Sequence, residues 1–200
     1  MSDTEWVVFD LGGVLIRLGG AAEFGGMIGE GDEREVWARW LRCPWVRAYE
    51  RGRCSTADFA AGMVEAYALD MTPDAFLSRF TAWPEGLYPG AKELVAALSR
   101  EVRTACLSNT NALHWQHQVD AEVLHGLFPK RFLSYELDLI KPDDAIYEHV
   151  VSELGCPAAS VLFLDDNQIN VDAARRSGID AHRVAGIDEV RALLGRRGLL

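Results

Sequence analysis

Several apolar stretches of this 200-residue chain end on side chains that can handle metal ions and phosphate. These polar residues are Asp10 after WVVF, Ser108 and Asn109 after TACL, Lys141 after YELDLI, and Asp165 and Asp166 after VLFL. Carboxylates from two strands can hold Mg²⁺, which binds few protein oxygens and completes its shell with water and substrate phosphate. Lysine supplies a compact positive charge, and a hydroxyl and main-chain N–H groups can donate to phosphate oxygens.

The elements that would position these residues alternate along the chain. Strand-like runs cover 6–11, 102–109, 131–136, 160–167 and 181–184, and helical patterns cover 89–100, 111–124, 143–155 and 170–178. This alternation predicts an α/β fold with a doubly wound, Rossmann-like parallel sheet. Ligands bind outside the carboxyl ends of the strands in such sheets, so the polar residues are expected to converge there.

One region interrupts the alternation. Residues 16–83 contain no convincing strand, whereas 32–42, 55–69 and 72–80 carry apolar residues at helical spacing. We therefore expect a core of residues 1–15 and 84–200, with an all-helical cap inserted at 16–83. Six glycines between positions 19 and 31 fit a hinge and a merely loose connection equally well. The tryptophans at 37 and 40 are expected to form an apolar stripe rather than a platform for a substrate ring.

Composition excludes several functions. The hydrophobic fraction of 49% and charged fraction of 25% are those of an ordinary globular protein. A net charge of −10 argues against nucleic-acid binding, which needs clustered cations. No apolar run is long enough to span a membrane, and the acidic start MSDTEW is unlike a signal peptide, so a cytoplasmic location is expected. Periodicity does not decide the oligomeric state.

The motifs VVFDLGGVL, CLSNTN, IKPD and LFLDDNQIN, in this order, resemble the four motifs of the haloacid dehalogenase-like hydrolases. The resemblance extends over essentially the whole chain and is greatest to the helical-cap subgroup, in particular to bacterial sugar-phosphate phosphatases with FDLGNV-type first motifs. It implies an enzyme with the expected core and cap. The implied reaction is hydrolysis of a small phosphorylated metabolite, such as a sugar 1-phosphate, with Mg²⁺ as cofactor.

The resemblance also implies roles for individual residues in phosphoryl transfer. Asp10 would be the nucleophile that forms an aspartyl-phosphate, and Lys141 would neutralise both the nucleophile and the transferring group. Ser108 would bind phosphoryl oxygens. We also assign Asn109, Lys141, Gly12 and Gly13 to the phosphate site.

The implied metal ligands come from the first and fourth motifs. Asp10 and Asp166 would bind Mg²⁺ directly, and Asp165 would do so directly or through a water molecule. The main-chain carbonyl of Gly12 would be a further ligand. The metal would screen the charges so that one anion can attack another.

Position 12 departs from the family pattern, because most of its phosphatases have there an aspartate that protonates the leaving alcohol. Three interpretations follow from Gly12. The substrate can have a good leaving group, as anomeric and acyl phosphates do, and we favour this interpretation. Another group, such as His114 or His117, can replace the acid. Alternatively, the site binds phosphate without turnover.

Two alternatives to a phosphatase stay open. A 2-haloacid dehalogenase would also use an aspartate nucleophile, and this chain shares Asn109, Tyr147 and Asn167 with those enzymes; however, Tyr147 is readily explained by packing and Asn167 by turn capping. A weak phosphate-binding or regulatory protein is the second alternative. It would explain why Gly12 and Asn170 replace acids of the family.

Overall fold

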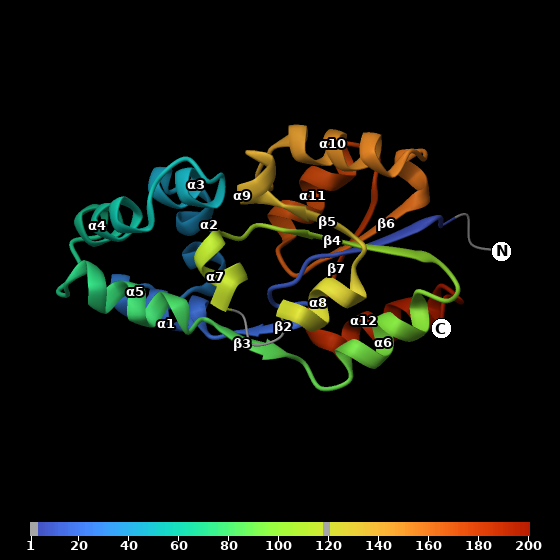
Figure 1. The fold of residues 1–200 in the computed structure, drawn as a ribbon, viewed down its shortest axis with the longest axis horizontal. Coiled ribbons are helices and arrows are strands. Elements are labelled where there is room, and N and C mark those ends of the chain that lie inside the picture. Colours follow the sequence, from blue (N-terminus) through green and yellow to red (C-terminus); the bar gives the residue numbers. More distant parts are fainter. Residues whose placement is uncertain (1–3, 118–120) are drawn as a thin grey trace.

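A parallel sheet forms the centre of the protein in the computed structural model, which describes residues 4–117 and 121–200 (Figure 1). Its strands are β1 (Trp6–Phe9), β4 (Arg103–Ser108), β5 (Lys130–Leu133), β6 (Val161–Asp165) and β7 (Asp180–Arg183). They lie in the order β5-β4-β1-β6-β7, and every pairing is parallel. The predicted doubly wound α/β sheet is confirmed.

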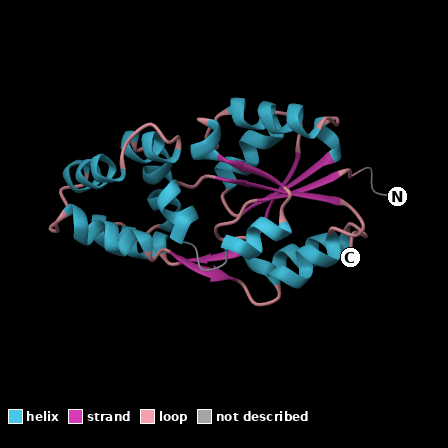
Figure 2. Ribbon diagram, in the orientation of Figure 1, coloured by secondary structure: helices cyan, strands magenta, loops and turns pink. Residues whose placement is uncertain are grey.

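Helices cover both faces of this sheet (Figures 1 and 2). One face carries α6 (Ala91–Leu98), α8 (Ala121–Leu127) and α12 (Gly186–Arg196), and the other carries α10 (Asp144–Leu154) and α11 (Gln168–Arg176). In β1, Val7 and Phe9 belong to the first hydrophobic cluster and Val8 to the second, and all three are fully buried. Because both faces are apolar, the polar residues of the central strands gather at the carboxyl edge.

The predicted element boundaries need three corrections. The strand predicted at 131–136 ends at Leu133, where the short helix α9 (Ser134–Leu137) begins. The helix predicted at 111–124 appears as α7 (Ala112–His117) and α8, and residues 118–120 of that prediction lie outside the described residues. The helix α12 and the 3₁₀ turn η1 (Ala158–Ser160) were not predicted.

Residues 20–81, the helical insertion, lie together at one end of the molecule (Figure 1). Its helices are α1 (Gly20–Ile28), α2 (Glu33–Arg42), α3 (Pro44–Glu50), α4 (Thr56–Ala66) and α5 (Pro73–Thr81). They share a hydrophobic cluster of their own. At its centre, Phe59 stacks on Tyr49 with ring centroids 4.3 Å apart and also contacts Phe76 and Phe80.

The connections to the helical insertion differ from the prediction. The short strands β2 (Ile16–Leu18) and β3 (Pro84–Leu87) pair antiparallel there, so the prediction that residues 16–83 contain no strand was wrong for β2. Three residues are too few to show strand periodicity. The glycine-rich stretch is not a loose connection at Gly20, where α1 begins, because a Cβ at this position would come within 2.4 Å of the Trp83 ring.

Ion pairs join α3 and the residues after it to the core. The guanidinium groups of Arg47 and Arg51 lie 2.6 and 2.5 Å from Asp143 Oδ2, and Arg53 lies 2.5 Å from Asp138. Asp143 stands two residues after Lys141. These contacts fix the end of α3 against the segment that carries Lys141.

None of the helices in the described ranges is long and apolar enough to cross a membrane.

Replacement of Phe59 by alanine tests the packing of the helical insertion. Phe59 is fully buried, so Phe59→Ala should lower the free energy of unfolding by about 3–5 kcal/mol, through lost burial and the cavity left behind. Urea denaturation followed by circular dichroism measures this. The control Leu200→Ala removes a side chain that is 49% exposed and should change little. Equal stability of the two variants would contradict the assigned cluster.

Candidate active site

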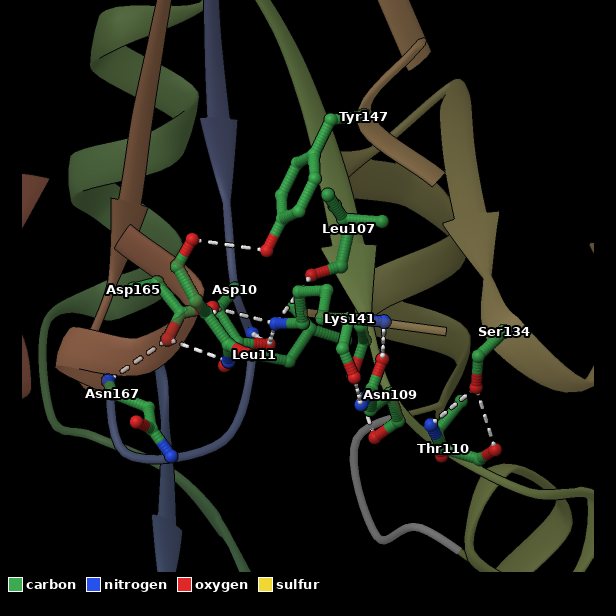
Figure 3. A network of polar contacts seen from close by, with 12 residues as sticks. Asp10, Leu11, Leu107, Asn109, Thr110, Ser134, Lys141, Tyr147, Asp165 and Asn167 are labelled. Atoms are coloured by element: carbon green, nitrogen blue, oxygen red, sulfur yellow. Dashed lines mark hydrogen bonds and ion pairs between the residues drawn. The ribbon is translucent and has the colours of Figure 1, made fainter. Parts of the chain in front are cut away.

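Lys141 joins two of the predicted carboxylates at the carboxyl edge of the sheet (Figure 3). Its Nζ lies 2.9 Å from Asp10 Oδ1 and 2.7 Å from Asp165 Oδ2, and it donates to the carbonyl of Leu107. The lysine side chain is 1% exposed, and that of Asp165 is fully buried. The two carboxylates outweigh the cost of burying the ammonium group, and they raise the pKa of Lys141 above its usual value. Lys141 therefore stays charged.

Both oxygens of Asp165 are occupied by protein donors. Oδ1 accepts from the main-chain N–H of Asn167 at 2.8 Å, Oδ2 receives Lys141, and the Asn170 amide donates to both oxygens at 3.1 Å. Tyr147 in turn donates to the carbonyl of Asn170. Asn167 caps α11, as expected, because its side chain accepts from Ile169 N–H. This network explains why Asp165 is held in one orientation.

Asp10 offers one carboxylate oxygen for chemistry. Its Oδ1 accepts from Leu11 N–H at 2.7 Å and from Lys141, whereas no group in the described part of the chain donates to Oδ2. Asp10 is 8% exposed, and its burial raises its pKa to about 7 against the opposing effect of Lys141. An oriented carboxylate with a free oxygen beside a fixed cation can act as a nucleophile toward a substrate in front of it.

The third carboxylate, Asp166, supplies the negative charge that a metal ion would balance. Oxygens of Asp10, Asp165 and Asp166 lie within 4.8 Å of one another. Burial and the two neighbouring carboxylates raise the pKa of Asp166 to about 8. Three acids beside one lysine leave a deficit of positive charge, and hard oxygen donors are the ligands that Mg²⁺ prefers. The donor set therefore fits Mg²⁺.

The predicted phosphate-site residues of β4 have different surroundings. Ser108 is 5% exposed, and within residues 4–117 and 121–200 its hydroxyl has only a long contact of 3.5 Å to the Asn109 carbonyl, so it can donate to a ligand. The side-chain oxygen of Asn109 accepts from Lys141 N–H at 2.9 Å, and its amide nitrogen donates to the Lys141 carbonyl at 3.0 Å. Asn109 thus holds the lysine segment in place. Phosphate binding by Asn109 stays a prediction.

A side chain from β2 occupies the space beside Gly12. A Cβ built at position 12 would lie 2.6 Å from Leu18 Cδ1, so an acid cannot be added there unless Leu18 moves. Gly13 has a φ of +67°, and its Cβ would meet Asp166 Oδ2 at 2.0 Å. Glycine at 13 thus lets the main chain approach the Asp166 carboxylate.

A cavity lies between these strand ends and the helical insertion. The core contributes Asp10, Gly12, Ser108, Asn109, Lys141 and Asp166 to its lining, and the insertion contributes Trp37, Trp40, Leu41, Glu50 and Phe80. Trp40 is only 5% exposed and packs in the cluster of the insertion, as the predicted apolar stripe requires. Six of the eight predicted site residues thus line one cavity with aromatic side chains of the insertion, whereas Gly13 and Asp165 lie behind this wall.

Neither histidine suggested as a replacement acid is free to exchange a proton in the cavity. His114 lines the cavity, but its Nε2 donates to the Phe80 carbonyl at 2.7 Å and its Nδ1 contacts the Asn111 amide. Burial lowers the pKa of His114 to about 4, so the ring is neutral. His117 is exposed, does not line the cavity, and contacts the Leu113 carbonyl.

Glu50 is a buried acid on the wall of the cavity that was not predicted from the sequence. It is the last residue of α3 and is 6% exposed. Its Oε1 accepts from the Trp40 indole at 3.2 Å, whereas Oε2 has no partner among the described residues. Burial raises the pKa of Glu50 to about 7. In PWVRAYE no spacing distinguishes this glutamate from a surface residue, because its burial depends on how α3 packs.

The raised pKa of Glu50 predicts a pH-dependent stability difference. Its ordinary pKa is 4.5, against about 7 in the fold, so folding favours the neutral carboxyl. The stabilisation that comes from the higher proton affinity of Glu50 in the folded state is complete below pH 4.5, and it is lost as the pH rises through 7. Glu50→Gln should therefore be more stable than the wild type at about pH 8.5, on the order of 2–3 kcal/mol, and near equal to it at about pH 4.5. Urea titrations at both pH values test this, and a pH-independent difference would contradict it.

Comparisons with known proteins give a family and a fold. A family model described as haloacid dehalogenase-like hydrolase matches residues 4–178. A D-ribitol-5-phosphate phosphatase from Bacteroides thetaiotaomicron is 20% identical over 182 residues, which cover 87% of this chain and 88% of that enzyme. A drimenol cyclase from Aspergillus calidoustus is 37% identical over 81 residues, which cover 38% of this chain but only 15% of the cyclase.

Solved structures share the fold over the full chain. A haloacid dehalogenase family enzyme from Bacteroides thetaiotaomicron, in complex with magnesium and inorganic phosphate, matches with a TM-score of 0.72 at 24% identity, covering 94% of this chain and 98% of that one. A dehalogenase matches with a TM-score of 0.70 at 19% identity, covering 98% of both chains. The range matched by the family model includes all the strand ends whose side chains meet in the cavity. Because this match covers most of the chain, the chain belongs to the haloacid dehalogenase-like hydrolases.

Proposed function

We propose that this protein is a Mg²⁺-dependent phosphatase that hydrolyses a small phosphorylated metabolite through an aspartyl-phosphate on Asp10. The observation that carries the proposal is the arrangement of Asp10, whose Oδ1 is held by Lys141 and Leu11 N–H while Oδ2 has no donor among the described residues. The phosphatase activity of the Bacteroides thetaiotaomicron relative and the magnesium and phosphate in a structural neighbour support it.

The chain's own residues account for substrate binding and transfer. The Ser108 hydroxyl, with its long contact of 3.5 Å, can turn to a phosphoryl oxygen, and the main-chain N–H of Gly12 is a candidate for another. The N–H of Gly13 already donates to the Ile16 carbonyl at 2.8 Å, so Gly13 would serve the phosphate site by its conformation alone. Lys141 lowers the repulsion between the Asp10 carboxylate and the dianionic phosphate. Asp10 then attacks the phosphorus, the alcohol leaves, and water hydrolyses the aspartyl-phosphate in a second step.

Magnesium would be held by Asp10, Asp166 and the Gly12 carbonyl. Asp165 would act through a water molecule, because its oxygens already accept from Lys141, Asn167 and Asn170. When bound, the ion supplies positive charge for both the attacking and the transferring oxygens.

We further propose that residues 16–83 act as a cap over the cavity, on a core of residues 1–15 and 84–200. The aromatic side chains of the insertion would enclose the part of the substrate beyond the phosphate and exclude water. If no residue protonates the leaving oxygen, a sugar 1-phosphate is the substrate type that we favour from the sequence, because its anomeric oxygen leaves with little protonation.

A 2-haloacid dehalogenase is the second candidate, and the structural match to a dehalogenase favours it. The reaction would also use Asp10, but it needs no metal. It would leave Asp166, a half-buried acid beside Asp10 and Asp165, with no role in the reaction. We therefore prefer the phosphatase.

Phosphate release from a panel of phosphate esters tests the proposed function. The wild type should release phosphate with Mg²⁺ and lose this activity in EDTA. Asp10→Asn should lower the rate of phosphate release at least about 10³-fold, because the amide is a poor nucleophile. The control Asp74→Asn changes an exposed acid of α5 and should be fully active.

Chloride release from 2-haloacids, unaffected by EDTA and absent in Asp10→Asn, would establish the dehalogenase instead. Binding of phosphate and Mg²⁺ with no turnover of any ester would contradict both enzymatic candidates and indicate a phosphate-binding protein.

A further inference from the structure

We propose that Glu50 is the catalytic acid and base of the reaction, and that it takes over the proton transfers that Gly12 cannot perform. The inference rests on the proposed phosphatase function and names a residue of the helical insertion for the step that the first motif lacks. Three lines of structural evidence lead to it: the direction of attack, the state of the other titratable groups in the cavity, and the surroundings of the Glu50 carboxyl.

The direction of attack places the leaving oxygen on the side of the helical insertion. Asp10 attacks from the carboxyl edge of the sheet, and an in-line displacement puts the leaving oxygen opposite the attacking one. The opposite side of the cavity is formed by the insertion, to which Glu50 belongs. The ion pairs of Arg47 and Arg51 with Asp143 hold α3 against the Lys141 segment, so the carboxyl has a fixed place relative to Lys141.

The remaining titratable groups on the described cavity wall are already engaged. Asp10 is the nucleophile, Lys141 is bound to two carboxylates, and Asp166 belongs to the metal cluster. His114 is neutral and uses both ring nitrogens in contacts with the protein. Glu50 is left as the group that can give and take a proton.

The surroundings of Glu50 suit this task. The Trp40 indole orients the carboxyl through Oε1, and Oε2 has no hydrogen-bond partner in the described part of the chain. Burial raises its pKa to about 7, and the charges that act on it are those of Lys141 and Arg47, which lower the pKa, and Asp10, which raises it. An acid with a pKa near the working pH is effective both as a donor and, after donation, as an acceptor.

Glu50 gives up a proton in the first step and takes one back in the second. As the bond between Asp10 and phosphorus forms and the ester P–O bond breaks, the Glu50 proton moves to the leaving oxygen, and a neutral alcohol departs. In the second step water attacks phosphorus, its proton moves to the Glu50 carboxylate, and the bond between phosphorus and Asp10 breaks. Phosphate leaves, and both side chains return to their starting states.

The dependence of Glu50→Gln on the leaving group tests the inference. The amide keeps the size of the side chain and an acceptor for Trp40, but it cannot donate the proton. With Mg²⁺, kcat/KM for the best primary alkyl phosphate should fall about 10²–10³-fold, because an alkoxide must be protonated to leave. For p-nitrophenyl phosphate, whose phenolate leaves unprotonated, it should fall less than about threefold. The control Glu65→Gln changes an exposed acid of α4 and should alter neither value.

A rescue experiment provides a second readout. Gly12→Asp introduces an acid, and Leu18→Ala makes room for it. Added together to the Glu50→Gln variant, these two changes should raise kcat/KM for the alkyl phosphate at least about tenfold. A loss caused only by disturbed packing of α3 would not be repaired by a carboxylate on the first motif.

Three results would overturn the inference while leaving the phosphatase in place. They are an equal loss on both esters, no loss on either, and a wild type that hydrolyses only aryl, acyl or anomeric phosphates. A wild type inactive on every ester with Mg²⁺ would overturn the proposed function and the inference together.

Discussion

The buried ammonium group of Lys141, held between Asp10 and Asp165, is the interaction on which the rest of the site depends. An unpaired charge at this depth would cost several kcal/mol, so the lysine and the two carboxylates must be brought together for any of them to be buried. Three separate parts of the chain supply them: the end of β1, the end of β6 and the segment after α9. Asn109 fixes the third part by bonding to the main chain of Lys141 in both directions.

The ion pairs of Lys141 give the carboxylates of the site different surroundings. Asp165 has both oxygens occupied and serves as a support. Among the residues that the structure describes, none donates to the second oxygen of Asp10 and no cationic side chain pairs with Asp166. Proximity of like charges raises the energy of the cluster, and a divalent cation relieves it. The fit of the carboxylates to a divalent cation and the orientation of Asp10 thus have a common origin in the charge balance around one lysine.

The helical insertion supplies the aromatic side chains and the additional acid of the cavity wall. It holds this acid, Glu50, in a position that is unfavourable for an ionised carboxyl. Leu18, at the start of the connection, fills the space beside Gly12. An apolar side chain therefore stands next to the first motif, and an acid stands across the cavity. This arrangement is consistent with transfer of the protonation step from the core to the insertion.

The sequence by itself determined the parallel sheet, most of its strands and the convergence of Asp10, Ser108, Lys141, Asp165 and Asp166, because long apolar runs that end on polar residues admit few arrangements. Local patterns did not predict the pairing of β2 with β3, the helix α1 or the role of Asn109. Short strands and amide contacts depend on partners that are distant in sequence. Only the tertiary structure revealed Glu50. Its burial, its unpartnered oxygen and its position on the cavity wall arise from the docking of α3 on the core, which no spacing in the chain encodes.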